Sequence, residues 1–159
     1  MKIAIVMGSK SDYPVIEKAE AIIKEFGVSF ETRIISAHRT PRVAEDFASK
    51  AEETGIEVII AAAGKAAHLG GVIAAYTPLP VIGLPIKSST LDGLDSLLSM
   101  VQMPKGIPVA TVAIDGAENA ALLAIQILSL KYPELRQKMK DYKKKMEEDI
   151  VRMDREFQN

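Results

Sequence analysis

The chain has 159 residues and no cysteine, and its 20 basic and 21 acidic residues give a formal net charge of −1. This length suits one compact domain, and the lack of cysteine excludes disulfides, thiolate nucleophiles and thiolate metal sites, as in a reducing cytoplasm. A charge near zero gives no overall field to attract nucleic acid or an anionic membrane. The apolar run at residues 3–7 is too short for a signal peptide, and no stretch approaches the roughly 18 apolar residues of a membrane span. We therefore expect a cytoplasmic protein with no nucleic-acid or membrane partner.

Strand-like and helix-like patterns alternate along the first 131 residues. Short apolar runs predict strands at residues 3–7, 56–63, 80–85 and 108–114, and an alternating pattern predicts a strand at residues 28–36. Helical spacing predicts helices at residues 14–26, 43–51, 95–101 and 117–130, with a short helix opened by the turn at residues 64–71. This alternation predicts an α/β fold with a single doubly wound parallel sheet, helices on both faces, and the flavodoxin-like strand order 2-1-3-4-5.

The sequence pattern of the last part of the chain predicts a long helix. Tyr132 and Pro133 interrupt the pattern, and apolar residues then recur at steps of three or four through residues 134–157. Such a helix would be about 36 Å long, roughly the width of the domain. We expect residues 1–131 to form the catalytic domain and residues 132–159 a C-terminal helix that packs on a neighbouring subunit; packing along its own domain is the alternative.

The predicted strand order brings three turns together. The turns at residues 8–12, 36–40 and 64–69 follow strands 1, 2 and 3 and lie side by side at the carboxyl edge of the sheet, where such folds bind ligands.

The first turn reads Gly8-Ser9-Lys10-Ser11-Asp12 and leads into a helix. Backbone N–H groups and hydroxyls at a helix N-terminus favour an anion. The turn has neither a Walker loop nor a GxGxxG fingerprint, which argues against ATP or a dinucleotide. In the alternative interpretation, Ser9, Ser11 and Asp12 only cap the helix.

The chain contains only two histidines, His38 and His68, and both fall in these turns. Imidazole can give and take a proton near neutral pH, which suits general acid/base catalysis. Without a nearby acidic pair or cysteine, two histidines make a poor metal site, so we expect metal-free chemistry. Arg39 matches phosphate bidentately and indicates a phosphorylated small molecule. The alternatives are a structural His68 that caps a turn and a solvated Arg39. Thr40 and Pro41 predict the N-cap and first position of the next helix.

Four motifs in the chain are similar to those of one enzyme family. They are residues 7–12 (MGSKSD), 36–41 (SAHRTP) and 66–69 (AAHL), and residues 95–99 (DSLLS) continuing through 101–104 (VQMP). In this order, and over almost the entire chain, they resemble the PurE family of purine biosynthesis, class I, the N5-carboxyaminoimidazole ribonucleotide mutases.

The resemblance implies a flavodoxin-like fold and an assembly that is usually an octamer. It also implies an isomerase that uses no cofactor or metal. The reaction it implies moves a carboxylate from the exocyclic nitrogen to the ring carbon C4 of an aminoimidazole ribonucleotide. His38 matches the family's general acid/base, Ser9 and Arg39 its phosphate-binding positions, and Asp12 its ribose-binding position. The further candidates for substrate binding are Ser11, Ser36, Ala37, Gly64, Ala66, His68 and Leu69, and we expect the loop at residues 88–90 to line the pocket with His68.

Two residues depart from the family pattern, which usually has Gly where Lys65 stands and Pro where Gly70 stands. We expect Lys65 to point to solvent; the alternative is a cation beside the carboxylate or phosphate of the substrate. Gly70 is expected to loosen the turn.

Two other functions remain open. One is an aminoimidazole ribonucleotide carboxylase that uses free CO₂, and the other is a phosphate- or nucleotide-binding module that catalyses nothing.

Overall fold

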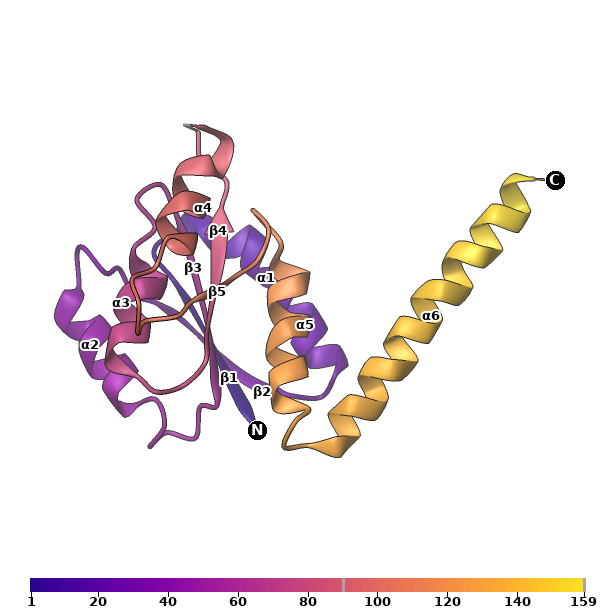
Figure 1. The fold of residues 1–159 in the computed structure, drawn as a ribbon, viewed down its shortest axis with the longest axis horizontal. Coiled ribbons are helices and arrows are strands. Elements are labelled where there is room, and N and C mark those ends of the chain that lie inside the picture. The colour runs from indigo at the N-terminus through magenta and orange to yellow at the C-terminus, as the bar shows by residue number, and fades with distance from the viewer. Residues whose placement is uncertain (90, 159) are drawn as a thin grey trace.

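A five-stranded parallel sheet forms the centre of the protein in the computed structural model, which describes residues 1–89 and 91–158 (Figure 1). Within these residues the strand order is β2-β1-β3-β4-β5, and every neighbouring pair is parallel. The strands are β1 (Lys2–Met7), β2 (Ser29–Ile34), β3 (Val58–Gly64), β4 (Val81–Ile86) and β5 (Ala110–Thr111). The predicted α/β class and the predicted strand order are both confirmed.

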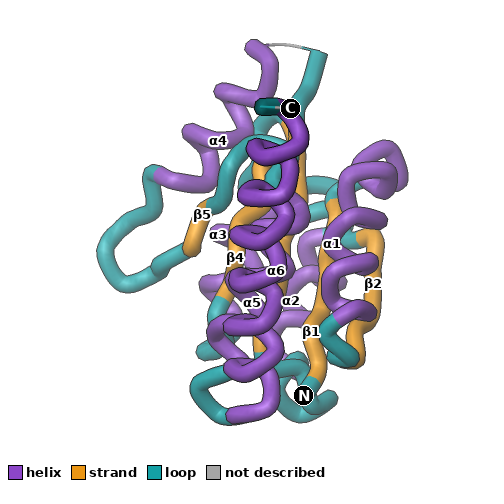
Figure 2. The backbone as a smooth tube through the Cα atoms, turned by 90° about the vertical axis from the view of Figure 1, so that its right-hand side faces the viewer, coloured by secondary structure: helices purple, strands orange, loops and turns teal. Residues whose placement is uncertain are grey.

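Helices cover both faces of the sheet (Figures 1 and 2). They are α1 (Tyr13–Glu25), α2 (Pro41–Lys50), α3 (Leu69–Tyr76), α4 (Leu94–Val101), α5 (Ala117–Leu128) and α6 (Pro133–Phe157), with short 3-10 helices η1 (Lys10–Asp12) and η2 (Leu91–Gly93). Helices α1 and α5 pack together against one face, and α2, α3 and α4 pack against the other. The right-handed crossovers of parallel strands require this two-sided arrangement.

The central strands are apolar because both of their faces are buried. In β1, Ile3 and Ile5 face the α1 and α5 layer, whereas Ala4 and Val6 face the opposite layer, and all four are 0% exposed. Each fully buried isoleucine contributes about 2 kcal/mol through the hydrophobic effect. A continuous apolar run is therefore the pattern of a strand in this position.

The last strand is much shorter than expected. The sequence predicts a strand at residues 108–114, but only Ala110 and Thr111 pair regularly with β4. One further hydrogen bond joins the Val112 N–H to the Gly83 carbonyl (3.1 Å), and the chain then turns through Asp115 in a left-handed conformation (φ 55°). Because β5 lies at the edge of the sheet, only one neighbour supports it, and the apolar run continues as an irregular segment. Helix α5 likewise ends two residues before the predicted Leu130, which is exposed.

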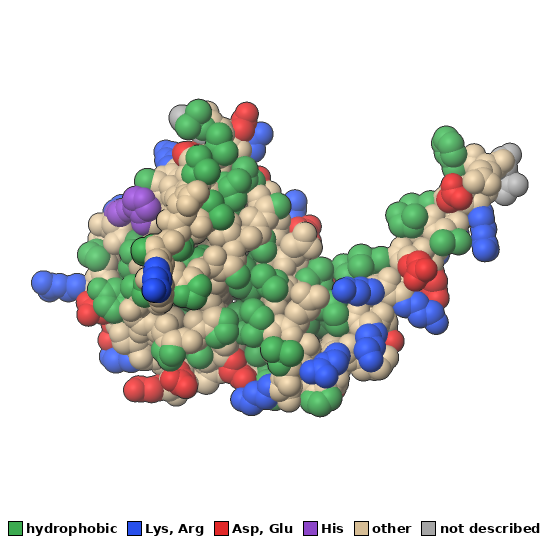
Figure 3. Space-filling model, in the orientation of Figure 1, with side chains coloured by type: hydrophobic (Ala, Val, Ile, Leu, Met, Phe, Trp, Pro, Cys, Tyr) green, Lys and Arg blue, Asp and Glu red, His purple; other side chains and the backbone are tan. Residues whose placement is uncertain are grey.

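Helix α6 docks on the domain only through its first turns (Figure 1). Leu135 and Met139 are buried, and the ring of Tyr142 lies 5.6 Å from that of Phe26. Beyond this point the apolar residues of the helix are exposed, and Figure 3 shows hydrophobic side chains along the projecting part. The exposed set is Met146, Ile150, Val151, Met153 and Phe157. Among the described residues, no helix is long and apolar enough to cross a membrane.

Glu57 connects the segment that precedes α6 to the N-terminus of the chain, next to β1, through hydrogen bonds and ion pairs. One of its carboxylate oxygens accepts a hydrogen bond from the Tyr132 hydroxyl (2.8 Å) and lies 3.4 Å from the N-terminal amine of Met1, and the other pairs with Lys131 (2.9 Å). Burial of the carboxylate raises its pKa, but the hydrogen bonds and the charge of Lys131 outweigh burial, so the pKa of Glu57 lies below its ordinary value of 4.5.

Replacing Glu57 with glutamine should lower the free energy of unfolding by about 1–2 kcal/mol at pH 7. A lowered pKa stabilises the folded state above the ordinary pKa, and this contribution disappears as the pH falls through the pKa of the folded protein. Urea unfolding from pH 7 to pH 3 should therefore show the two proteins converging below pH 4.5. Glu52→Gln, an exposed neighbour, is the control; a Glu57→Gln effect that is no larger, or that does not decrease as the pH falls below 4.5, would contradict the assignment.

Candidate active site

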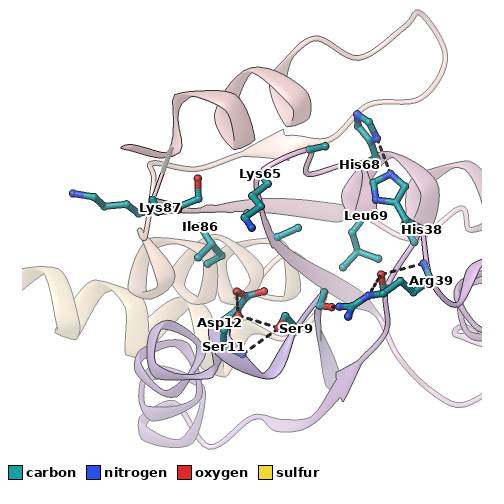
Figure 4. A pocket seen from close by; sticks show the side chains of 18 residues that line it. Ser9, Ser11, Asp12, His38, Arg39, Lys65, His68, Leu69, Ile86 and Lys87 are labelled. Atoms are coloured by element: carbon teal, nitrogen blue, oxygen red, sulfur yellow. Dashed lines mark hydrogen bonds between the residues drawn. The ribbon is translucent and has the colours of Figure 1, made fainter. Parts of the chain in front are cut away.

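A cavity of about 670 Å³ lies at the carboxyl ends of the first four strands (Figure 4). All of the predicted site residues line it: Ser9, Ser11, Asp12, Ser36, Ala37, His38, Arg39, Gly64, Ala66, His68 and Leu69. Ser88 and Ser89 also line it, whereas Thr90, the last residue of the predicted pocket loop, lies outside the described residues. The volume is in the range of small-molecule sites.

The turn after β1 forms a small network of hydroxyls and a carboxylate. Ser9 is the N-cap of η1, since its Oγ accepts from the Ser11 N–H (3.3 Å) and from the Ser11 hydroxyl (2.9 Å). Ser9 therefore caps the helix η1, as the alternative interpretation expected, and it also lines the cavity. Asp12 precedes α1 without a side-chain cap bond.

Asp12 is a buried carboxylate at the wall of this cavity, only 8% exposed. Its Oδ1 accepts from the Ser11 hydroxyl (3.2 Å). Burial raises the pKa of Asp12 above its ordinary value, and the hydrogen bonds from Ser11 and from the Ser9 backbone partly offset that rise. A carboxylate held in this way can accept hydrogen bonds from the hydroxyls of a ligand.

The turn after β2 is closed by its own side chains. The Thr40 hydroxyl donates to the Ser36 carbonyl (2.9 Å) and accepts from the Ser36 N–H (3.0 Å), and the Arg39 N–H donates to the Ser36 hydroxyl (3.2 Å). Thr40 occupies the predicted N-cap position and Pro41 the first helical position, but the Thr40 hydroxyl makes no cap bond to the helix. It stabilises the turn instead.

The guanidinium of Arg39 joins the turn after β2 to the turn after β1. Its Nη2 donates to the Gly8 carbonyl (3.1 Å), and its Nε lies 3.4 Å from the Ser36 hydroxyl. These contacts hold the guanidinium beside Ser9 at the edge of the cavity (Figure 4). A planar group with further N–H donors suits an oxyanion such as phosphate.

The two histidines of the chain are hydrogen-bonded to each other. His38 Nε2 lies 2.9 Å from His68 Nδ1, the ring centroids are 5.0 Å apart, and the rings meet edge to face at 84°. One of these two nitrogens must carry the proton and the other must accept it. His68 occupies the N-cap position of α3 but makes no side-chain cap bond. The pair lies at the surface of the protein (Figure 3), where a proton can enter or leave. In the described part of the chain, no group of three His, Cys, Asp or Glu could hold a metal ion.

The two departures from the family pattern lie at this cavity or beside it. Lys65 lines the cavity, and its backbone is left-handed (φ 58°), which costs a residue other than glycine about 1–2 kcal/mol. Its side chain is exposed, as expected of one that points to solvent, and in Figure 4 it extends into the cavity. Gly70 lies in the first turn of α3, where an added Cβ would be 3.5 Å from Val109 and 3.8 Å from Ala61. Packing therefore limits the freedom that this glycine gives to the chain.

Ile86 and Lys87 also line the cavity, and the sequence interpretation missed them. They lie at and just after the carboxyl end of β4, which neighbours β3 in the sheet. Like the first three turns, this end of β4 lies at the carboxyl edge of the sheet, where such folds bind ligands. Lys87 is held by its N–H, which donates to Asp115 (2.9 Å), and by an ion pair with Asp92 (3.2 Å).

Residues 2–149 match the AIR carboxylase family. The chain belongs to this family. One member, the N5-carboxyaminoimidazole ribonucleotide mutase of Pyrococcus horikoshii, is 64% identical over 156 residues, which are 96% of this chain and 88% of the relative. The phosphoribosylaminoimidazole carboxylase of Saccharomyces cerevisiae is 54% identical over 149 residues, 94% of this chain but only 26% of that protein.

A solved structure agrees with this assignment to the AIR carboxylase family. The crystal structure of Treponema denticola PurE superposes with a TM-score of 0.90 at 31% identity and covers 98% of this chain and 97% of that one. The resemblance to PurE expected from the four motifs is confirmed.

Proposed function

We propose that the protein is an N5-carboxyaminoimidazole ribonucleotide mutase of de novo purine biosynthesis, an isomerase that forms 4-carboxy-5-aminoimidazole ribonucleotide. The observation that carries the proposal is the cavity that brings His38 together with Arg39 and Ser9. It combines a proton-transfer group with an anion site in one small-molecule pocket. The mutase of Pyrococcus horikoshii, which matches along nearly its whole length, supports the same reaction.

Each turn contributes a different part of substrate binding in this proposal. Arg39 and Ser9 bind the phosphate, and the buried carboxylate of Asp12 accepts from the ribose hydroxyls. The base then lies toward the histidine pair. The walls around it are formed by Ser11, Ser36, Ala37, Gly64, Ala66, His68 and Leu69.

The reaction moves one CO₂ and one proton in opposite directions. The bond between the exocyclic nitrogen and the carboxylate carbon breaks, and the nitrogen gains a proton as CO₂ is released. The ring carbon C4 then attacks this CO₂, and the proton displaced from C4 leaves. His38 gives the first proton and takes the second, so the enzyme ends in its starting state. The pocket keeps CO₂ beside C4, which replaces a bimolecular encounter with an intramolecular one. No cofactor or metal has a step in this scheme.

A label experiment tests the proposal. Purified protein is mixed with N5-carboxyaminoimidazole ribonucleotide carrying a ¹³C carboxylate, without ATP, in the presence of unlabelled bicarbonate. We expect the product to retain the label and the rate not to depend on bicarbonate. A carboxylase would need bicarbonate and lose the label, and a binding module would bind the ribonucleotide without converting it; either outcome refutes the mutase.

We propose further that the projecting part of α6 packs on a neighbouring copy of the chain, in an assembly that the PurE resemblance indicates to be an octamer. Support comes from the apolar stripe, which continues past the docked turns and leaves Ile150 65%, Met153 56% and Phe157 92% exposed. Exposed apolar surface of this kind is typical of an interface. A cytoplasmic location is part of the same proposal, and the absence of cysteine supports it.

Ile150→Glu should reduce the assembly to smaller species, because the charge would be buried without a partner at the interface. Light scattering after size-exclusion chromatography measures the change in mass. Lys144→Gln, on the opposite side of the same helix, changes the charge equally and should leave the mass unchanged. A wild-type monomer, or an Ile150→Glu protein of unchanged mass, would contradict the proposed interface.

A further inference from the structure

Two cations in the cavity have no carboxylate partner among the described residues, namely Arg39 and Lys65. The third, Lys87, differs because its ammonium group is 3.2 Å from Asp92. The carboxylate of Asp12, the acidic residue in this wall, already accepts from Ser11. Among the described residues, neither Arg39 nor Lys65 forms an ion pair, so both cations can face an anionic ligand, with Asp12 as the one carboxylate in the same wall.

These two cations come from different turns and are held differently. The Arg39 guanidinium is fixed beside Ser9 by its bond to the Gly8 carbonyl (3.1 Å). Lys65 belongs to the turn after β3 that also carries His68, the hydrogen-bonding partner of His38. In Figure 4 its side chain extends into the cavity from the side opposite the turn after β1.

The substrate of the proposed mutase also has two anionic groups, a phosphate and a carboxylate. Arg39 and Ser9 account for the phosphate, which leaves Lys65 for the carboxylate. We propose that Lys65 binds the carboxylate that is transferred and thereby makes the site prefer carboxylated over uncarboxylated aminoimidazole ribonucleotide. This inference rests on the proposed function and adds a specificity-determining residue to it.

The backbone of Lys65 supports a role for its side chain. At φ 58° a glycine would be unstrained, whereas lysine is not. Strained residues that persist at a site are candidates for function, because the surrounding structure must hold them there. The left-handed conformation directs the side chain into the cavity, where a long, flexible ammonium group can reach an anion.

The test compares two ligands by isothermal titration calorimetry. Lys65→Met keeps the length of the side chain and the backbone strain but removes the charge. We expect the Kd of 4-carboxy-5-aminoimidazole ribonucleotide to rise about tenfold, as for the loss of one charge-assisted hydrogen bond. The Kd of 5-aminoimidazole ribonucleotide, which has the phosphate but no carboxylate, should stay within about twofold. Lys65→Arg should restore the preference, and Lys105→Met, an exposed lysine outside the cavity, should change neither Kd.

Two results would overturn the assignment. Equal weakening of both ligands would place Lys65 at the phosphate, and no change in either would make it a solvated side chain. Lys65→Gly separates binding from folding: it should raise the melting temperature by removing the strain and still lose the preference for the carboxylated ligand. Failure of the proposed function looks different, because the wild-type protein would then not convert N5-carboxyaminoimidazole ribonucleotide with retention of its label, whatever the Kd values of the Lys65 variants.

Discussion

Replacing His38 with asparagine should lower kcat about 10²- to 10⁴-fold, the range that general acid/base catalysis contributes. Asparagine keeps a polar group near His68 but cannot give and take a proton at neutral pH. Because the proposed phosphate and ribose contacts involve Arg39, Ser9 and Asp12, binding of the ribonucleotide should change little. The measurement is the initial rate of conversion together with the Kd of the product from calorimetry.

The outcome of the His38 experiment must be separated from a loss of folding. Thermal unfolding of the variant should match that of the wild type, because both rings of the pair are exposed and contribute little to the core. Activity within tenfold of the wild type would show that another group transfers the proton. An equal loss of binding and turnover would make His38 a substrate-binding residue instead.

Replacing Arg39 with leucine should raise the Kd of the ribonucleotide about 100-fold. The guanidinium offers more than one charge-assisted hydrogen bond to a phosphate, and each contributes about 1.5–3 kcal/mol. Its present contacts with Gly8 and Ser36 hold it in place before the ligand arrives, so little side-chain entropy is lost on binding. Calorimetry with 5-aminoimidazole ribonucleotide measures the effect.

Two comparisons make the Arg39 prediction specific. The loss should fall to less than about threefold for the dephosphorylated riboside, because that ligand lacks the phosphate that Arg39 is proposed to bind. Arg42→Leu removes an exposed arginine three residues along the same segment, outside the cavity, and serves as the control. If Arg39→Leu weakens the riboside as much as the ribonucleotide, the phosphate lies elsewhere.

The sequence predicted where the turns of the candidate site meet, because the pattern of strands determines their positions. Once strands 1, 2 and 3 are identified as parallel neighbours, the turns that contain Ser9, His38 and His68 must meet at one edge of the sheet. The hydrogen bond between the two histidines could not be predicted from the sequence, because it depends on how each turn is closed. Ile86 and Lys87 were missed although the same argument reaches them, because no chemical motif marks the end of the fourth strand.

The predictions of the fold were wrong where the local sequence pattern favours one structure and the neighbouring elements do not stabilise it. Residues 108–114 have the composition of a strand, but an edge position gives them one neighbour and only two residues pair regularly. The sequence also does not show that the φ of Lys65 is 58° or that its exposed side chain lines the cavity. For α6 the stripe was evident, yet a stripe alone does not say where docking stops. That point, after Tyr142, depends on the end of α1 and on Phe26.

The two edges of the sheet bear on how copies of this protein can aggregate. One edge is β5, with only two paired residues, and the other is β2, which carries Glu31 and Arg33 within its six residues. Short and charged edge strands are the means by which proteins prevent a further strand from joining the sheet. Growth of a continuous sheet from one molecule into the next, the route to fibrils and strand exchange, is therefore disfavoured at both ends. Association is left to the helical surfaces, where it can stop at a closed assembly of defined size.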